Sequence, residues 1–238
     1  MDRTNIVKLF SFLEKQTGKK LSLSKRLQLG LPVSEEELDI KGDLSLANAK
    51  GLNLIRLPDN IRITGSLFLA GSSLLKLPNN LTVGRNLNIS YTEIREIPES
   101  LKVGSGLYME SCPIEKIPDN LQINEIIHAP NSKLKHLPKN INPECQLNYN
   151  GTLIENLPLT LTVGSLLIAR TKVKQLPIKL TVRGAINIAN TGIEELPKPG
   201  NIKAGGFVYV FNTPLLEKYG KEYLITEYPH LKFNFNVV

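Results

Sequence analysis

Three histidines and two cysteines are the side chains of this chain best suited to catalysis or metal binding: His128, His136, His230, Cys112 and Cys145. A metal site or an activated nucleophile needs such residues at spacings that let them converge on one point. The five residues form no pair with metal-ligand spacing. The glycine-rich stretch at 104–106 lacks both a nucleophile-elbow pattern and the lysine of a phosphate loop. The sequence therefore predicts a protein that is not an enzyme and that needs no cofactor or metal ion.

Most of these residues lie in a sequence that repeats about every twenty residues. Eight prolines recur at steps of twenty residues, with one step of nineteen: Pro58, Pro78, Pro98, Pro118, Pro138, Pro158, Pro177 and Pro197. A fixed period of this length is the signature of stacked-repeat proteins, in which each unit buries its apolar side against the next. Cys112 takes the place that threonine holds in other repeats. We therefore expect it to be a buried structural thiol.

Each repeat follows the pattern LxIxxTxIxxLPxxLxVG. The "LxI" segment alternates apolar and polar residues, which predicts a strand with both aliphatic side chains on one face. Proline cannot donate a hydrogen bond to a sheet, so the "LP" segment is expected to be an extended connector. The "LxVG" segment is expected to form a second short strand that ends in a glycine turn. The hydroxyl at the threonine position is expected to bond backbone across its turn.

The stretch "LNISYTEIREIPESL" at residues 87–101 resembles the LxLxxNxLxxLPxxL signature of leucine-rich repeats. It is similar to the short, twenty-residue type of bacterial ubiquitin-ligase effectors, and the chain also looks like repeat proteins encoded by bacteriophages. The resemblance implies a right-handed α/β solenoid, mostly β, of about 8–9 coils. The asparagine of the signature is replaced here by threonine, serine or Cys112. No effector-type catalytic domain is expected.

Three regions follow from this pattern: residues 1–30 as an N-terminal amphipathic helix and basic cap, residues 31–213 as the solenoid, and residues 214–238 as a C-terminal cap of a helix and a strand. The first helix is expected over residues 3–16, with one apolar face formed by Ile6, Val7, Phe10 and Leu13. Caps of this kind cover the core and the strand edges that a solenoid exposes at its ends.

The chain carries a net charge of +7, and much of it lies in residues 1–30, which hold seven basic and two acidic residues. The repeats are only mildly basic, whereas a nucleic-acid-binding protein usually has a basic stripe along its body. Three interpretations of the basic N-terminus stay open: a solvated helix face, a surface that binds nucleic acid or another anionic partner, and a membrane-binding helix.

Composition sets the remaining limits. Hydrophobic residues make up 41% of the chain, enough to build a core. No apolar run approaches the roughly 18 residues that a membrane span requires. No signal peptide is apparent at the N-terminus, and two cysteines give no disulfide framework. We therefore expect a cytoplasmic protein, in the cytoplasm of the bacterial host if a phage encodes it.

The middle residue of each "LxI" strand must point away from the core, because side chains alternate along a strand. Residues beside this row, including Glu110, also point outward. From these we predict a partner-binding site that consists of Phe68, Asn88, Tyr91, Tyr108, His128, Asn148, Arg170 and Asn187. For aromatics near the ends the alternative is packing beneath a cap, which we expect for Phe207, Tyr209 and Phe211.

These observations predict a non-catalytic module that binds a host or viral protein through its strand face, since tyrosine and arginine often dominate binding energy. The phage resemblance implies two roles, an inhibitor of a host defence protein or a component of a virion or viral complex. The alternative function is nucleic-acid or anionic-surface binding through residues 1–30. The oligomeric state stays open.

Overall fold

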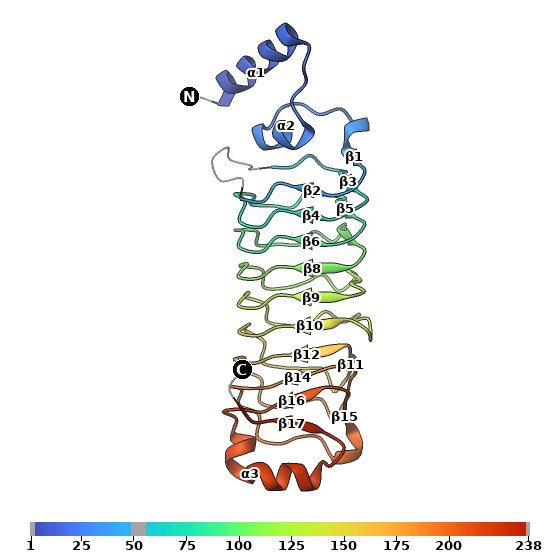
Figure 1. Cartoon of the computed structure of the whole chain (residues 1–238), viewed down its shortest axis with the longest axis vertical. Helices are drawn as coiled ribbons and strands as arrows, with labels where there is room; N and C mark the ends of the chain where they lie inside the picture. Colours follow the sequence, from blue (N-terminus) through green and yellow to red (C-terminus); the bar gives the residue numbers. More distant parts are fainter. Residues whose placement is uncertain (1–2, 49–55, 237–238) are drawn as a thin grey trace.

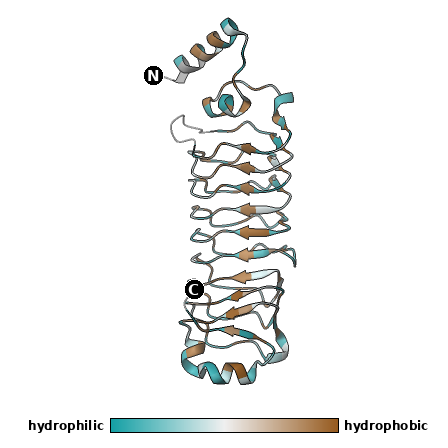
Figure 2. Ribbon diagram, viewed as in Figure 1, coloured by the Kyte–Doolittle hydropathy of each residue, from teal (hydrophilic) through white to brown (hydrophobic). Residues whose placement is uncertain are grey.

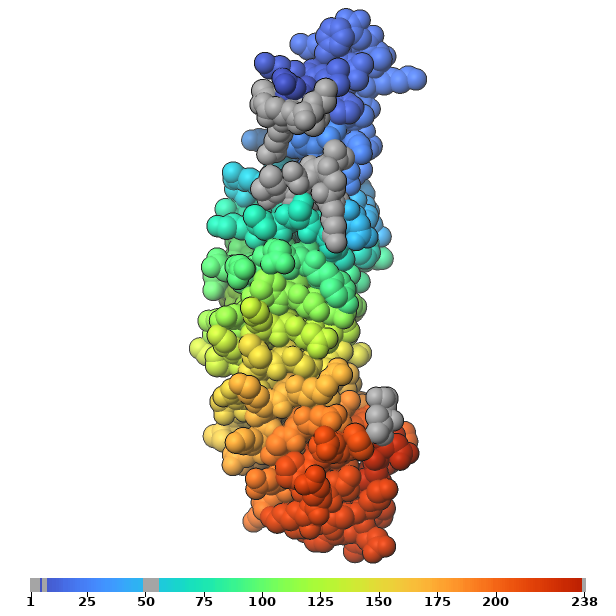
Figure 3. Space-filling view, turned by 90° about the vertical axis from the view of Figure 1, so that its left-hand side faces the viewer, coloured from blue at the N-terminus to red at the C-terminus, as the bar shows by residue number. Residues whose placement is uncertain are grey.

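The computed structural model describes residues 3–48 and 56–236 of the chain. It is a parallel-strand β-solenoid of about 8 turns, mostly β, with three α-helices at its ends. Figure 1 shows the coils stacked as a column, with the N-terminal helices at one end and the C-terminal helix at the other. The predicted solenoid is therefore confirmed. Figure 3 shows the same column from the side, as one continuous packed body between its two ends.

One long parallel sheet runs the length of the column. Its strands are the "LxI" segments, and neighbouring coils pair in register, so that Leu87 lies opposite Leu67 and Leu107. In spatial order from the N-terminal end the strands are β2 (Leu44–Ser45), β4 (Leu67–Phe68), β6 (Leu87–Asn88), β8 (Gly106–Tyr108), β9 (Ile126–His128), β10 (Gln146–Asn148), β12 (Ser165–Leu167), β14 (Ile186–Asn187), β16 (Phe207–Tyr209) and β17 (Lys232–Asn234).

The "LxVG" segments form two shorter sheets at the back of the column, as predicted, but with a gap between them. The gap spans two coils, at residues 122–123 and 142–143. In the second coil Pro143 occupies the repeat position of Val103 and Val163, and proline has no N–H for a ladder. The four-stranded sheet contains β1 (Asp39–Ile40), β3 (Arg62–Ile63), β5 (Thr82–Val83) and β7 (Lys102–Val103), and the three-stranded sheet contains β11 (Thr160–Val163), β13 (Lys179–Val182) and β15 (Ile202–Ala204).

The chain bends at the glycine of "LxVG", as predicted, and this glycine also has a second role. A Cβ atom added at Gly104 would lie 2.0 Å from the carbonyl oxygen of Gly84 in the preceding coil. The same clash, at 2.2 Å, would occur between Gly164 and the carbonyl oxygen of Glu144. At these two coils the backbones approach so closely that glycine leaves the room they need, whereas Thr64, Asn124 and Arg183 fill the same repeat position in other coils.

The interior is filled by the aliphatic positions of the repeat, and hydroxyls close the turn after several of the strands, with Ser72, whose hydroxyl has no hydrogen-bond partner, as an exception. The Thr92 hydroxyl donates to the carbonyl oxygen of Ile89 at 2.7 Å, and Thr152 and Thr191 make the same bond three residues back. Cys112 is 1% exposed, and its Sγ lies 3.0 Å from the Ile89 carbonyl oxygen. The predicted hydroxyl bonds and the predicted buried thiol are therefore confirmed. Figure 2 shows the apolar residues recurring from strand to strand along the column.

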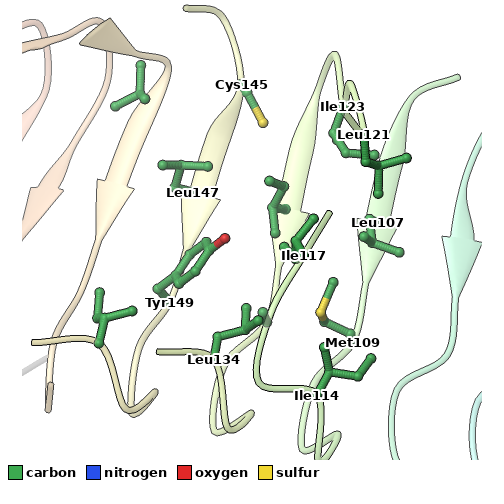
Figure 4. Packing of buried hydrophobic residues seen from close by; sticks show 14 of the residues in the cluster. Leu107, Met109, Ile114, Ile117, Leu121, Ile123, Leu134, Cys145, Leu147 and Tyr149 are labelled. Carbon is green, nitrogen blue, oxygen red and sulfur yellow. The ribbon is translucent and has the colours of Figure 1, made fainter. Parts of the chain in front are cut away.

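Tyr149 departs from the aliphatic pattern of the interior. Its ring is fully buried at the repeat position that Ala129 occupies in the preceding coil, so a small side chain there is matched by a large one here. Figure 4 shows the ring among buried apolar side chains that include Leu147 and Leu134. The hydroxyl has no hydrogen-bond partner, and burial raises the pKa of this phenol far above its usual value.

Both ends of the column carry caps. At the C-terminal end α3 (Pro214–Glu227) places Leu215 and Leu224 in the core, and β17 pairs with β16, as predicted. At the N-terminal end the covering helix is the short α2 (Leu23–Leu29), which contributes Leu27 to the core. Arg26 of α2 forms a two-pronged ion pair with Glu37, just after which the first coil begins.

The first helix, α1 (Arg3–Thr17), forms at the predicted residues but does not cover the solenoid. Figure 1 shows it beyond α2, away from the coils. The expected apolar face included Ile6 and Val7, whose side chains lie outside the described part of the structure, and Leu13, which is 41% exposed. The covering role expected of this helix belongs to α2. Within residues 3–48 and 56–236 no helix combines the length and apolar character that a membrane crossing requires.

Candidate protein-binding face

The outer surface of the long sheet, here called the strand face, consists of three rows of side chains that run along the column. Strand pairing keeps each row in register from β4 to β16. The middle row is Phe68, Asn88, Tyr108, His128, Asn148, Leu167, Asn187 and Tyr209. The row formed by the residues two positions earlier is Ser66, Asn86, Gly106, Ile126, Gln146, Ser165, Ala185 and Phe207. The row formed by the residues two positions later is Ala70, Ser90, Glu110, Pro130, Asn150, Ala169, Ala189 and Phe211.

The strand face is almost free of charge. All residues of the three rows are described, and Glu110 is the one ionisable acid or base among them apart from His128 and the phenols. The back of the same coils carries exposed charges such as Arg62, Lys102 and Lys179. The chain as a whole has a net charge of +7. From β4 to β16 charge is thus nearly excluded from one face of a basic protein, whereas the end strands place Asp43 and Lys232 in register with Ser66 and Phe207. The cores of protein interfaces show the same depletion of charge.

The middle row lies outward, as predicted. All eight of its side chains are half-buried, whereas the aliphatic residues on either side of them in the strands are buried. Phe68 belongs to this group and is half-buried like the others. The expected packing of Phe207 beneath the C-terminal cap is wrong, because this side chain is 49% exposed. The reason is that β17 extends the sheet beside β16 and leaves the strand face open.

Four neighbouring coils bring together a group here called the central cluster: Tyr91, Tyr108, Glu110, His128 and Asn148. The His128 Nε2 atom lies 3.9 Å from a Glu110 carboxylate oxygen. The His128 Nδ1 atom lies 3.3 Å from the Asn148 side-chain nitrogen. The Tyr108 and His128 rings pack with centroids 5.6 Å apart. A hydrogen bond with Glu110 raises the pKa of the Tyr91 phenol.

The central cluster offers several recognition chemistries side by side. The Glu110 side chain is 31% exposed and that of His128 30% exposed, so both are open to a partner. The cluster presents a carboxylate, an imidazole, an amide and two aromatic rings within one patch. Such a mixture suits a partner surface with hydrogen-bond donors and apolar groups.

The remaining predicted residues lie outside the central cluster. Asn88 and Asn187 each accept a hydrogen bond from the backbone N–H two residues on, at 3.0 Å and 3.1 Å. Their side-chain oxygens therefore bind the backbone at the end of the strand. Phe68 lies next to Asn88 toward the N-terminal end. Arg170 is exposed in a turn beyond β12. The predicted site is therefore one compact group with flanking residues along the face.

Tyr91 and Arg170 occupy an unusual backbone position. Each coil turns after its strand through a residue with positive φ, which favours glycine or asparagine. Other coils fill this position with residues such as Gly71, Asn131 and Gly151. Tyr91 has φ 59° and Arg170 has φ 57°, a conformation that disfavours side chains with a bulky Cβ. Strained backbone of this kind tends to persist where a side chain has a function.

Glu110 is the residue that sequence reasoning passed over. It appeared only as an outward neighbour and not among the predicted site residues, yet it contacts both Tyr91 and His128. The sequence offered one signal for Glu110: it is the single carboxylate among the residues of the three rows.

The two cysteines, the most nucleophilic side chains described, are both buried. Burial raises the pKa of both thiols, that of Cys145 to about 11, so neither is an activated nucleophile. Within residues 3–48 and 56–236 no three histidine, cysteine or acidic side chains gather as a metal site would need. His136 is exposed on the proline side of its coil, away from the central cluster.

Comparison with models of protein families gives no match, and a search of curated proteins finds no similar sequence. The resemblance to leucine-rich repeats thus stays a prediction from the motif.

Proposed function

We propose that this protein is a non-catalytic binding protein that holds a protein partner on its strand face, centred on the central cluster. One observation carries the proposal: a basic chain excludes charge from three rows along one side, and the exception, Glu110, is bound into a group of aromatic and polar residues. Interface cores are depleted of charge and enriched in aromatic side chains.

The shape of the face supports a protein partner over a small ligand. Register pairing keeps the three rows parallel from β4 to β16, so the surface is long and regular. Small ligands favour concave sites that bury most of their surface. An extended row of half-exposed side chains instead favours a partner that makes many shallow contacts.

The proposal extends to identity and role. We assign the chain to the leucine-rich-repeat type on the basis of its motif. Its resemblance to repeat proteins encoded by bacteriophages supports a role as an inhibitor of a host defence protein or as a component of a virion or viral complex. The two cysteines are buried and unpaired, in keeping with the proposed cytoplasmic location.

A crosslinking experiment tests the face directly. A photoreactive phenylalanine analogue at Tyr108 should capture a specific protein in the native host, and the same analogue at Lys102 on the back should not. Affinity of the captured protein, made in pure form, should then fall at least tenfold for the double variant Tyr108→Ala, His128→Ala. Thermal unfolding of that variant serves as the folding control. Equal crosslinking from both positions, or unchanged affinity, would contradict the proposal.

A further inference from the structure

The first helix, α1, exposes large apolar side chains to solvent. A surface helix normally directs its apolar residues at the core and its polar residues at solvent. In α1 the large apolar side chains Phe12, Leu9 and Leu13 are 58%, 43% and 41% exposed. They share one side, because positions three and four residues apart are neighbours on a helix.

The opposite side of α1 faces its own chain through a carboxylate. A Glu14 carboxylate oxygen accepts a hydrogen bond from the Leu21 N–H at 2.8 Å. The charge of Glu14 also adds to the larger effect of Glu37 in raising the pKa of Arg26, so Glu14 faces α2. Phe10 and Ser11, one turn before Glu14, are half-buried with it. This contact fixes which side of α1 looks inward.

The same contact removes the one acidic residue of the helix from the outer side. Lys8 and Lys15 are two turns apart on one side of α1 and are exposed. Lys19 and Lys20, in the segment that follows, are exposed as well. The outer side of the N-terminal segment therefore combines an apolar strip with positive charge.

We propose that this outer side of α1 binds an anionic lipid surface, with Leu9, Phe12 and Leu13 inserted between headgroups and Lys8 and Lys15 against them. An amphipathic helix with basic residues beside its apolar face lies in the plane of a membrane interface. Nucleic acid accounts for the lysines but not for three exposed apolar side chains. The inference is independent of the strand-face proposal, because α1 contributes no residue to that face.

The geometry of the column makes such binding compatible with a partner on the strand face. Figure 1 shows α1 at the extreme N-terminal end, beyond α2, whereas the central cluster lies on β8, β9 and β10 and the turns beside them. Binding through α1 would hold the column by one end and leave its long side accessible.

Vesicle binding by the full chain tests the inference. The chain contains no tryptophan, so Phe12→Trp adds a single fluorescent reporter on the outer side. Vesicles of phosphatidylcholine with about one third phosphatidylglycerol should shift its emission to the blue and should sediment with the protein, whereas pure phosphatidylcholine should do neither. Failure to bind the anionic vesicles would overturn the inference.

Two pairs of variants separate lipid from other occupants. Lys8→Glu with Lys15→Glu should lower partitioning by at least about twentyfold, since each lysine lost costs about fivefold, and Lys102→Glu with Lys179→Glu on the back should have little effect. Leu9→Ser with Leu13→Ser should abolish binding, while Ile225→Ser, an exposed apolar residue of α3, should not.

Two other results would also overturn the proposal. Equal binding of duplex DNA that the leucine variants leave intact would indicate a nucleic-acid surface. Concentration-dependent self-association that the leucine variants abolish, without vesicle binding, would indicate a second copy of the chain. The variants leave the core untouched, so an unchanged melting temperature confirms that each retains its solenoid.

Discussion

The strand face and the back of the column are built from the same repeat but are used differently. The long sheet continues through ten strands, while the back is divided into sheets of four and three strands. The back carries lysines and arginines and tolerates Pro143, whereas the strand face keeps its register and excludes charge. A repeat therefore fixes packing on both sides, and the positions that packing leaves free reveal which side is reserved for a partner.

The largest expected effect lies at the back. Gly104→Ala places a methyl group 2.0 Å from the carbonyl oxygen of Gly84, so two coils must separate. We expect a loss of roughly 3 kcal/mol in the free energy of unfolding, measured by chemical denaturation. Gly200→Ala is the matched control, because nothing lies within 4 Å of its added methyl group. A tolerated Gly104→Ala would show that close coil contact is dispensable.

The next effect compares charge on the two sides. Asn148→Lys introduces a charge into the central cluster, and burying it against a partner should weaken binding about thirtyfold. Lys102→Glu on the back changes charge by a larger amount and should leave affinity within about twofold. Both affinities can be measured by titration calorimetry with the captured partner. Equal losses would remove the distinction between the two sides.

The third prediction compares how removal of a tyrosine hydroxyl changes stability on the inner and the outer side of the long sheet. Tyr149→Phe removes a buried hydroxyl that has no hydrogen-bond partner, so we expect a gain of about 1–2 kcal/mol in the free energy of unfolding. Tyr108→Phe, in the half-exposed middle row, should change stability by less than about 0.5 kcal/mol. Thermal denaturation compares the two, and destabilisation by Tyr149→Phe would indicate that the hydroxyl has a hidden partner.

The smallest expected effect is a trade between stability and binding at one turn. Tyr91→Asn should stabilise the fold by about 1 kcal/mol, because asparagine adopts positive φ more readily, and Asn131→Tyr should destabilise it by a similar amount. Tyr91→Asn should also weaken partner binding, since it breaks the contact with Glu110. A stabilised variant with full affinity would show that the strain at Tyr91 has no function.

The period of the prolines was enough to predict the solenoid, the alternation within "LxI" predicted the outward row, the threonine position predicted the hydroxyl bonds, and residues 214–238 predicted the C-terminal cap. The sequence was less informative at three other places. It could not predict which N-terminal helix covers the core, because an apolar strip such as that of α1 suits a core and an external surface equally. It also missed Glu110, since the contact with Tyr91 and His128 arises only when three coils are stacked. The chain does bend at the glycine of "LxVG", as predicted, but the close approach between coils at this glycine was not predicted because it is not visible in one repeat.

The in-register pairing of coils has a consequence for how such a chain can change over evolutionary time. Each coil contacts chiefly its neighbours, so duplication or loss of a whole coil in a solenoid leaves the packing of the others intact. The one-residue shortening before Pro177 was absorbed without interrupting the long sheet. The central cluster, however, is assembled from consecutive coils between Tyr91 and Asn148. A coil gained or lost within that stretch would separate the residues of the cluster. The number of coils can therefore change elsewhere in the column, whereas the coils that form the cluster must stay together.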